Sequence, residues 1–143
     1  MGGTLSVEER VYTLSKRNDY NALSNLLAQI DRTDPTRKDR YLNCTMQGGN
    51  TPLIVASQKG CLQCVDLLIR YGADVQRIGR SPNGGGALHE AVEHSHAGVI
   101  DRLMRAGANP FVENVKGFTA MDVACARRNV ALLRTMERAA PWS

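Results

Sequence analysis

The chain has 143 residues, of which 43% are hydrophobic and only 5% aromatic, so it has the length of one domain with a mainly aliphatic core. Its net charge of +4 is mild and scattered along the chain, which does not indicate a nucleic-acid-binding protein. No apolar run approaches the roughly 20 residues of a membrane-spanning helix, and the charged segment 7–10 argues against a secretory signal. We therefore expect the chain in the cytosol or the nucleus.

The amino terminus, residues 1–5, is expected to be flexible and carries a lipidation pattern. Residues 1–6 read Met-Gly-x-x-x-Ser, in which Gly2 would bear a myristoyl chain after removal of the methionine. The same Ser6, followed three residues later by Glu9, also matches a capping box that starts a helix. Both interpretations stay open. A single acyl chain at Gly2 would give only weak, reversible membrane attachment.

Residues 6–30 are predicted to form a pair of helices. Apolar side chains recur at helical spacing through 7–17 and again from about Tyr20 to Ile30, and Asn18-Asp19 separates the two runs. Residues 31–45 follow as a long connection. Its first half carries charges of both signs and is expected to be a solvated loop.

Residues 51–75 form the unit against which the rest of the chain can be aligned. Thr51-Pro52 is typical of a helix start, because proline fits the first turn, and Gly60 ends that helix. A second apolar face runs from Cys64 to Leu68, and Gly72 closes it. Two such short helices cannot bury both apolar faces alone, so the unit needs neighbours of the same plan.

Two further copies of this unit follow at a spacing of about 33 residues. The alanine at Ala56 recurs at Ala91 and Ala124. The leucine at Leu68 recurs at Leu103, and Met136 takes its place in the last copy. Two extra residues lie in the glycine-rich connection 76–86, which lacks the Gly-Lys-Ser/Thr of a phosphate-binding loop.

With this register the chain resembles the ankyrin-repeat family over about residues 41–138. The Thr-Pro-Leu-His-x-Ala signature of that family stands at 51–56 with Ile54 in place of histidine, whereas 86–91 keeps the histidine, His89, and loses Thr-Pro. The resemblance implies an all-α solenoid of about four helix-turn-helix units with projecting turns. The expected divisions are a terminus 1–5, a degenerate capping repeat 6–30, a long connection 31–45, repeats 46–78 and 79–113, a carboxy-terminal capping repeat 114–138 and a tail 139–143.

Cysteines and histidines offer the main chemical alternatives. Cys61 and Cys64 have the spacing of zinc and redox sites, but Cys44 and Cys125 do not form a second pair, so we interpret the first two as small apolar core residues. No metal or cofactor is expected.

The segment from His89 to His94 resembles a zincin motif. Histidines five residues apart, however, lie on different sides of a helix. The family resemblance implies instead that His89 ties neighbouring turns together, while His94 and His96 lie in an exposed turn. No serine or cysteine forms a nucleophile motif with a histidine, so the chain is not expected to be an enzyme.

The resemblance also implies where a partner would bind, since ankyrin proteins use the concave surface formed by the projecting turns and the first helices. The family's groove positions correspond in this chain to Gln47, Asn50, Gln58, Lys59, Asn83, Glu93, His94, Val115, Lys116, Phe118 and Arg127, and the inserted turn adds Arg77 and Arg80. Phe118 beside Lys116 and Arg127 would be an apolar anchor flanked by positive charge, which favours a protein or peptide partner with an acidic, partly apolar segment. Polar outer helices predict a monomer.

The order of these segments also resembles the amino-terminal part of plant ubiquitin ligases that carry a carboxy-terminal RING finger. The shared features are a short helix pair after Met-Gly, about three repeats, and Trp142 soon after the last repeat. A RING needs paired Cys/His ligands, and none follows Trp142 in this chain. Three functions stay open: a non-catalytic scaffold or adaptor, the substrate-recognition part of such a ligase, and a myristoylated membrane adaptor that depends on Gly2.

Overall fold

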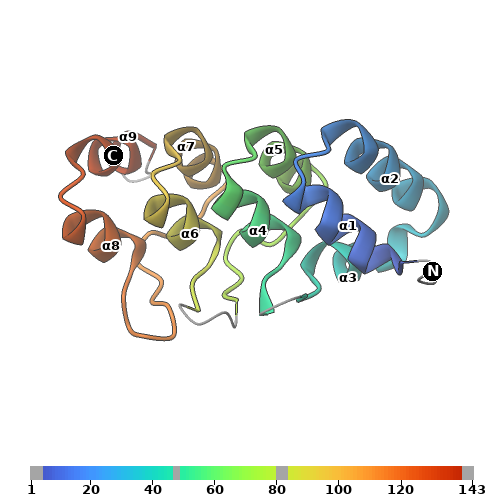
Figure 1. Ribbon diagram of the computed structural model, residues 1–143, viewed down its shortest axis with the longest axis horizontal. Coiled ribbons are helices and arrows are strands. Elements are labelled where there is room, and N and C mark those ends of the chain that lie inside the picture. The colour runs from blue at the N-terminus through green and yellow to red at the C-terminus, as the bar shows by residue number, and fades with distance from the viewer. Residues whose placement is uncertain (1–4, 47–48, 80–83, 140–143) are drawn as a thin grey trace.

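The computed structural model describes residues 5–46, 49–79 and 84–139, and in these ranges the regular structure is helical. The helices stack in two rows, with α1, α4, α6 and α8 in an inner row and α2, α5, α7 and α9 in an outer row (Figure 1). Their bounds are α1 Val7–Lys16, α2 Tyr20–Thr33, the 3₁₀ helix η1 Pro35–Arg37, α3 Lys38–Asn43, α4 Pro52–Lys59, α5 Leu62–Arg70, α6 Ala87–Glu93, α7 Ala97–Arg105, α8 Ala120–Ala126 and α9 Val130–Ala139. The predicted all-α repeat solenoid is confirmed.

Side-chain caps start several of these helices. The Oγ1 of Thr51 accepts a hydrogen bond from the backbone N–H of Ile54 at 3.2 Å, at the first turn of α4. Ser6 and Glu9 form the predicted capping box, in which Glu9 N–H donates to Ser6 Oγ at 3.2 Å and Ser6 N–H donates to Glu9 Oε2 at 2.9 Å. Each such bond satisfies an N–H that the helix itself leaves unpaired.

The turn after each inner helix contains a residue with left-handed backbone, at Asn18, Gly60, Ser95 and Arg128. Only the second of these is glycine, with φ of 74°. A Cβ at Gly60 would lie 2.6 Å from the ring of His96. Glycine is therefore favoured there by lack of space, since the equivalent turns adopt the same backbone conformation with other residues. The repeated turn geometry sets an equivalent register for the four inner helices.

The first half of the connection 31–45 is mostly exposed, as expected, but it is largely helical, so the prediction of a loop was wrong. Helix α2 continues to Thr33, and η1 and α3 follow directly. The charges are paired along these turns, as in the 3.0 Å contact between Lys38 Nζ and Asp31 Oδ1. Leu42 is fully buried and fastens α3 to the core. The alternating charges of this segment favoured a loop in the sequence, although the segment contains a short helix with one buried leucine.

The core lies between the two rows. Inner helices contribute small side chains, with Ala56, Ala91 and Ala124 fully buried, and outer helices contribute large ones such as Leu68 and Leu103. Small residues allow neighbouring inner helices to approach closely, while the larger side chains fill the space behind them. Within the described ranges, no helix combines the length and the hydropathy that crossing a bilayer requires.

Replacement of Leu68 by alanine should lower the free energy of unfolding by about 2–5 kcal/mol, because the fully buried side chain would leave a cavity. Leu62→Ala is the matched control on the same helix, since its side chain is 44% exposed, and it should cost less than about 1 kcal/mol. Urea unfolding followed by circular dichroism measures both. Equal losses would contradict the assigned faces of α5.

Candidate functional site

An open, largely apolar hollow of about 640 Å³ lies against α8 and the turn before it. We call it the C-terminal hollow. It is lined by Glu93, Gly117, Phe118, Asp122, Val123, Cys125, Ala126 and Arg127. Of the residues predicted to bind a partner, it therefore brings together Glu93, Phe118 and Arg127.

Phe118 combines a fixed backbone with an exposed ring. Its N–H donates to Asn114 Oδ1 at 3.0 Å, and its carbonyl accepts from Asn114 N–H at 2.8 Å and from His89 Nε2 at 3.0 Å. The side chain is nevertheless 53% exposed. Because the backbone of Phe118 is already fixed by these hydrogen bonds, a partner that covers the ring orders little further backbone.

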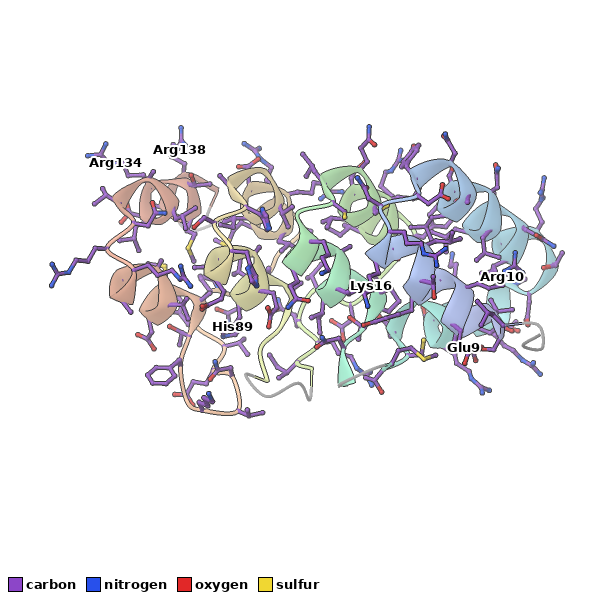
Figure 2. The ribbon with its side chains drawn as sticks, viewed as in Figure 1. Glu9, Arg10, Lys16, His89, Arg134 and Arg138 are labelled. Carbon is purple, nitrogen blue, oxygen red and sulfur yellow. The ribbon has the colours of Figure 1, made fainter. Side chains whose placement is uncertain are left out.

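His89 holds this turn in place. Its Nδ1 accepts from the N–H of Gly86 at 3.1 Å, so the proton lies on Nε2, which donates to the carbonyl of Phe118 in the next repeat. Burial lowers the pKa of His89 below its ordinary value, which favours the neutral ring that both hydrogen bonds require. The predicted role of His89 in tying turns together is confirmed, and Figure 2 shows it at the base of α6 above the projecting turns.

The charge around Phe118 differs from the expectation. Arg127 Nη2 lies 2.5 Å from Glu93 Oε1, an ion pair that joins α6 to the end of α8. Arg127 is therefore not an uncompensated positive charge beside Phe118. Glu93 and Arg127 were both predicted to line the binding surface, but their ion pair was not predicted.

Several other candidate positions are engaged within the protein. Asn50 is only 9% exposed, and its Oδ1 is buried without a hydrogen-bond partner among the described residues, so it is not the accessible groove position that was predicted. The carbonyl of half-buried Gln58 accepts from His96 Nε2 at 3.0 Å. His96 was expected in an exposed turn and instead joins two repeats. His94 is exposed, as predicted, and stacks on His96 with ring centroids 6.1 Å apart.

The remaining predicted positions are either exposed or outside the described ranges. Lys59, Arg77, Val115 and Lys116 are exposed. The other candidates, Gly2, Gln47, Arg80 and Asn83, lie outside the described residues, as does Trp142.

Glu90 is a buried carboxyl group that sequence reasoning did not single out as a site residue. It is 5% exposed and contributes, with Glu93 and Lys116, to a smaller hollow of about 200 Å³ beside the C-terminal one. Burial raises the pKa of Glu90, and the imidazole of His94 at 3.7 Å opposes that shift. A helix-face analysis of 87–93 could have indicated its burial, because Glu90 stands three residues after the core residue Ala87.

The cysteine pair lies in the core, as predicted. Cys61 and Cys64 are both buried, and burial raises the pKa of Cys64 to about 11. The pKa of Cys61 is raised for the same reason. Both thiols therefore stay protonated near neutral pH and act as small apolar groups.

A further hollow, of about 530 Å³, lies between α1 and α4, and of its lining residues only Lys59 was predicted from the sequence. We call it the N-terminal hollow. It is lined by Tyr12, Thr13, Lys16, Arg17 and Lys59. The equivalent turns at Asn18 and Gly60 provide a signal that could have found it, because they align Arg17 with the predicted position Lys59.

The repeat pattern in the sequence matches a known family. The family model described as ankyrin repeats, in three copies, matches residues 11–114. The chain belongs to the ankyrin-repeat family. Ankyrin repeats are protein–protein interaction modules that bind through their inner helices and projecting turns. The C-terminal hollow is lined by both kinds of element, and the N-terminal hollow is lined by the inner helices α1 and α4.

Relatives of this ankyrin chain include much longer proteins. Rice (Oryza sativa subsp. japonica) probable E3 ubiquitin-protein ligase XBOS34 is 31% identical over 138 residues, which are 96% of this chain and 25% of the rice protein. Mouse (Mus musculus) B-cell lymphoma 3 protein homolog is 33% identical over 89 residues, 62% of this chain and 19% of that protein. The Arabidopsis thaliana E3 ubiquitin-protein ligase KEG is 32% identical over 80 residues, 56% of this chain and 5% of that protein. The chain thus spans a quarter or less of each.

His89→Ala should destabilise the ankyrin array by about 1–3 kcal/mol at about pH 7.5, because it removes the donor to Phe118 O and the acceptor for Gly86 N–H. The folded-state pKa of His89 lies below its ordinary value of 6.5, so the unfolded chain takes up the proton first as the pH falls. The stability that His89 contributes is therefore complete above about pH 6.5 and declines below it.

The deficit of the variant should thus shrink between about pH 7.5 and about pH 5.5. Urea unfolding of both proteins at the two pH values measures it. Glu90 is present in both proteins, so its own titration largely cancels in the comparison. A stability deficit that is the same at both pH values would show that protonation of His89 does not make the stability depend on pH.

Proposed function

We propose that this chain is a non-catalytic scaffold or adaptor that binds a protein or peptide partner. The proposed binding surface, called the inner-helix face, consists of the inner helices α1, α4, α6 and α8 and the turns that precede them. The observation that carries the proposal is Phe118, an exposed aromatic ring on a turn whose backbone makes hydrogen bonds to Asn114 and His89. Aromatic residues of this kind often carry most of the binding free energy of an interface. The C-terminal hollow beside the ring supplies apolar surface from Val123 and Ala126 that a partner side chain can cover.

The partner is proposed to be partly acidic. The chain carries a net charge of +4, and Lys59 and Lys116 are exposed on the inner-helix face and its turns. Because Glu93 compensates Arg127, the attraction for an acidic segment does not centre on the C-terminal hollow. Contacts there are proposed to be mainly apolar, and charge recognition is assigned to other parts of the surface.

Phe118→Ala should weaken binding of the natural partner about 30-fold, the loss typical of a strong anchor residue. Phe111→Ala is the matched control, because Phe111 has a similar exposure of 58% and lines neither hollow. Proximity labelling in cells identifies proteins that depend on Phe118, and titration of those proteins measures the affinity. If both variants keep the same partners as the unaltered protein, the assignment of the C-terminal hollow is wrong.

The second candidate function is the substrate-recognition part of a ubiquitin ligase. It is favoured by the rice ligase, whose similarity extends over 96% of this chain. On this proposal the partner bound through Phe118 is the substrate, and transfer of ubiquitin requires a RING outside residues 1–143. Partners recovered from cells that express the native gene product should carry ubiquitin, and Phe118→Ala should remove it. Unmodified partners would favour the free adaptor.

Membrane attachment through Gly2 and the monomeric state are further proposals that rest on the sequence pattern. Intact-mass measurement of natively expressed protein tests the first, because a myristoyl group adds a defined mass to Gly2. Sedimentation measures the second. A cytosolic or nuclear location is proposed on the same basis.

A further inference from the structure

The N-terminal hollow gathers positive charge from two repeats. Lys16 lies in the last turn of α1, Arg17 caps that helix, and Lys59 ends α4. All three side chains are exposed, and together with Tyr12 and Thr13 they line one hollow of about 530 Å³. Figure 2 shows Lys16 beside α4, so the charges come together across the junction of the first two inner helices.

These three cations have no counterion in the described part of the chain. None of them forms an ion pair with a described carboxylate, whereas seven of the other lysine and arginine side chains do. Asp19 is the acidic residue closest in sequence to Lys16 and Arg17, and its Oδ1 accepts from Ala22 N–H at 3.2 Å as the cap of α2. Asp66, the closest to Lys59, is paired with Arg70 and Arg102. Three like charges around one hollow produce a local positive potential that attracts an anionic group.

The composition of the hollow favours an acidic peptide segment over a nucleic acid or a lipid layer. Tyr12 is buried, so no exposed aromatic face is available for stacking nucleic-acid bases. The exposed large apolar residues of the described chain lie elsewhere, so the hollow has no side chain to insert into a lipid layer. The lining residues of the N-terminal hollow come from α1 and α4, which stand in the same inner row as α6 and α8 (Figure 1). Residues of α6 and α8 in turn contribute to the C-terminal hollow.

We propose that the N-terminal hollow binds a run of aspartate or glutamate residues in the partner whose apolar segment covers Phe118. The inference rests on the proposed function and deepens it, since it assigns acidic recognition to Lys16, Arg17 and Lys59. The two hollows then have different roles. The N-terminal hollow attracts the partner through charge, and the C-terminal hollow supplies apolar contact. Electrostatic attraction of this kind mainly raises the association rate and selects the partner.

The test uses a fluorescein-labelled decaglutamate peptide as the probe, measured by fluorescence anisotropy with the complete chain. The variant Lys16→Glu, Arg17→Glu, Lys59→Glu should weaken peptide binding about tenfold or more, because it removes three attractions and adds repulsion. The control is Arg32→Glu, Arg134→Glu, Arg138→Glu, which changes the net charge equally on the outer helices α2 and α9. Figure 2 shows Arg134 and Arg138 pointing away from the inner row. The control should bind within about twofold of the unaltered chain.

Three measurements keep the outcome decisive. Lys16 and Lys59 also stabilise the carboxy-terminal ends of their helices, where glutamate would be unfavourable. A second variant therefore carries glutamine at the three positions. Its unfolding curve is recorded first, and its peptide affinity is then compared with that of the unaltered chain. Chemical-shift changes of ¹⁵N-labelled protein should concentrate at 12–17 and 58–60 when decaglutamate is added. Binding should weaken as salt shortens the range of the charges.

The proposal fails if the two triple variants lose the peptide equally, or if the shift changes fall outside the N-terminal hollow. It also fails if vesicles of phosphatidylserine bind at these residues while decaglutamate does not, since the surface would then recognise a membrane. Decaglutamate has no apolar anchor, so its binding does not depend on Phe118. A negative result would therefore remove acidic recognition from this hollow and leave the Phe118 experiment to decide the proposed function separately.

Discussion

Close packing of the inner helices is the constraint on which the rest of the structure depends. Ala56, Ala91 and Ala124 are fully buried and recur once in each repeat, so α4, α6 and α8 can approach one another without a large side chain between them. That approach brings the projecting turns of adjacent repeats into hydrogen-bonding distance. It also brings charged residues at the ends of successive inner helices together, which produces the ion pair between Glu93 and Arg127.

Histidines convert this packing into fixed geometry between repeats. His89 reaches from α6 to the carbonyl of Phe118, and His96 reaches from the start of α7 back to the carbonyl of Gln58. Each bond connects backbone of a neighbouring repeat to an imidazole that is at least partly buried. Repeat proteins gain much of their stability from such nearest-neighbour contacts. The same contacts hold the turn that presents Phe118, so the binding surface and the stability of the stack are physically linked.

The inner-helix face is electrostatically uneven. At its carboxy-terminal end, Glu93 neutralises Arg127 and leaves an apolar hollow around Phe118. At its amino-terminal end, Lys16, Arg17 and Lys59 occupy a hollow with no counterion among the described side chains. A partner that extends over both ends therefore contacts a positively charged surface at one end and an apolar surface at the other. This asymmetry arises because the helix-end positions of successive repeats carry different residues on nearly the same backbone.

The sequence by itself determined the repeat, the paired helices of each repeat and the burial of the cysteine pair. Those features follow from local patterns, namely apolar spacing, the caps at Ser6 and Thr51 and the recurrence of alanine, which act within one repeat or between identical repeats. Because His89 belongs to the repeated motif, its role could be predicted as well. The family membership rests on the same pattern.

Only the tertiary structure decided which of the predicted surface residues are available. Asn50 is buried, Arg127 is paired with Glu93, and His96 is bonded to Gln58, because side chains from different repeats meet across distances that no local pattern encodes. The connection 31–45 became helical for a similar reason, since Leu42 finds its apolar surroundings only in the assembled core. The N-terminal hollow likewise exists only because packing of α1 on α4 brings Lys16 and Arg17 to Lys59, about 40 positions away in the sequence.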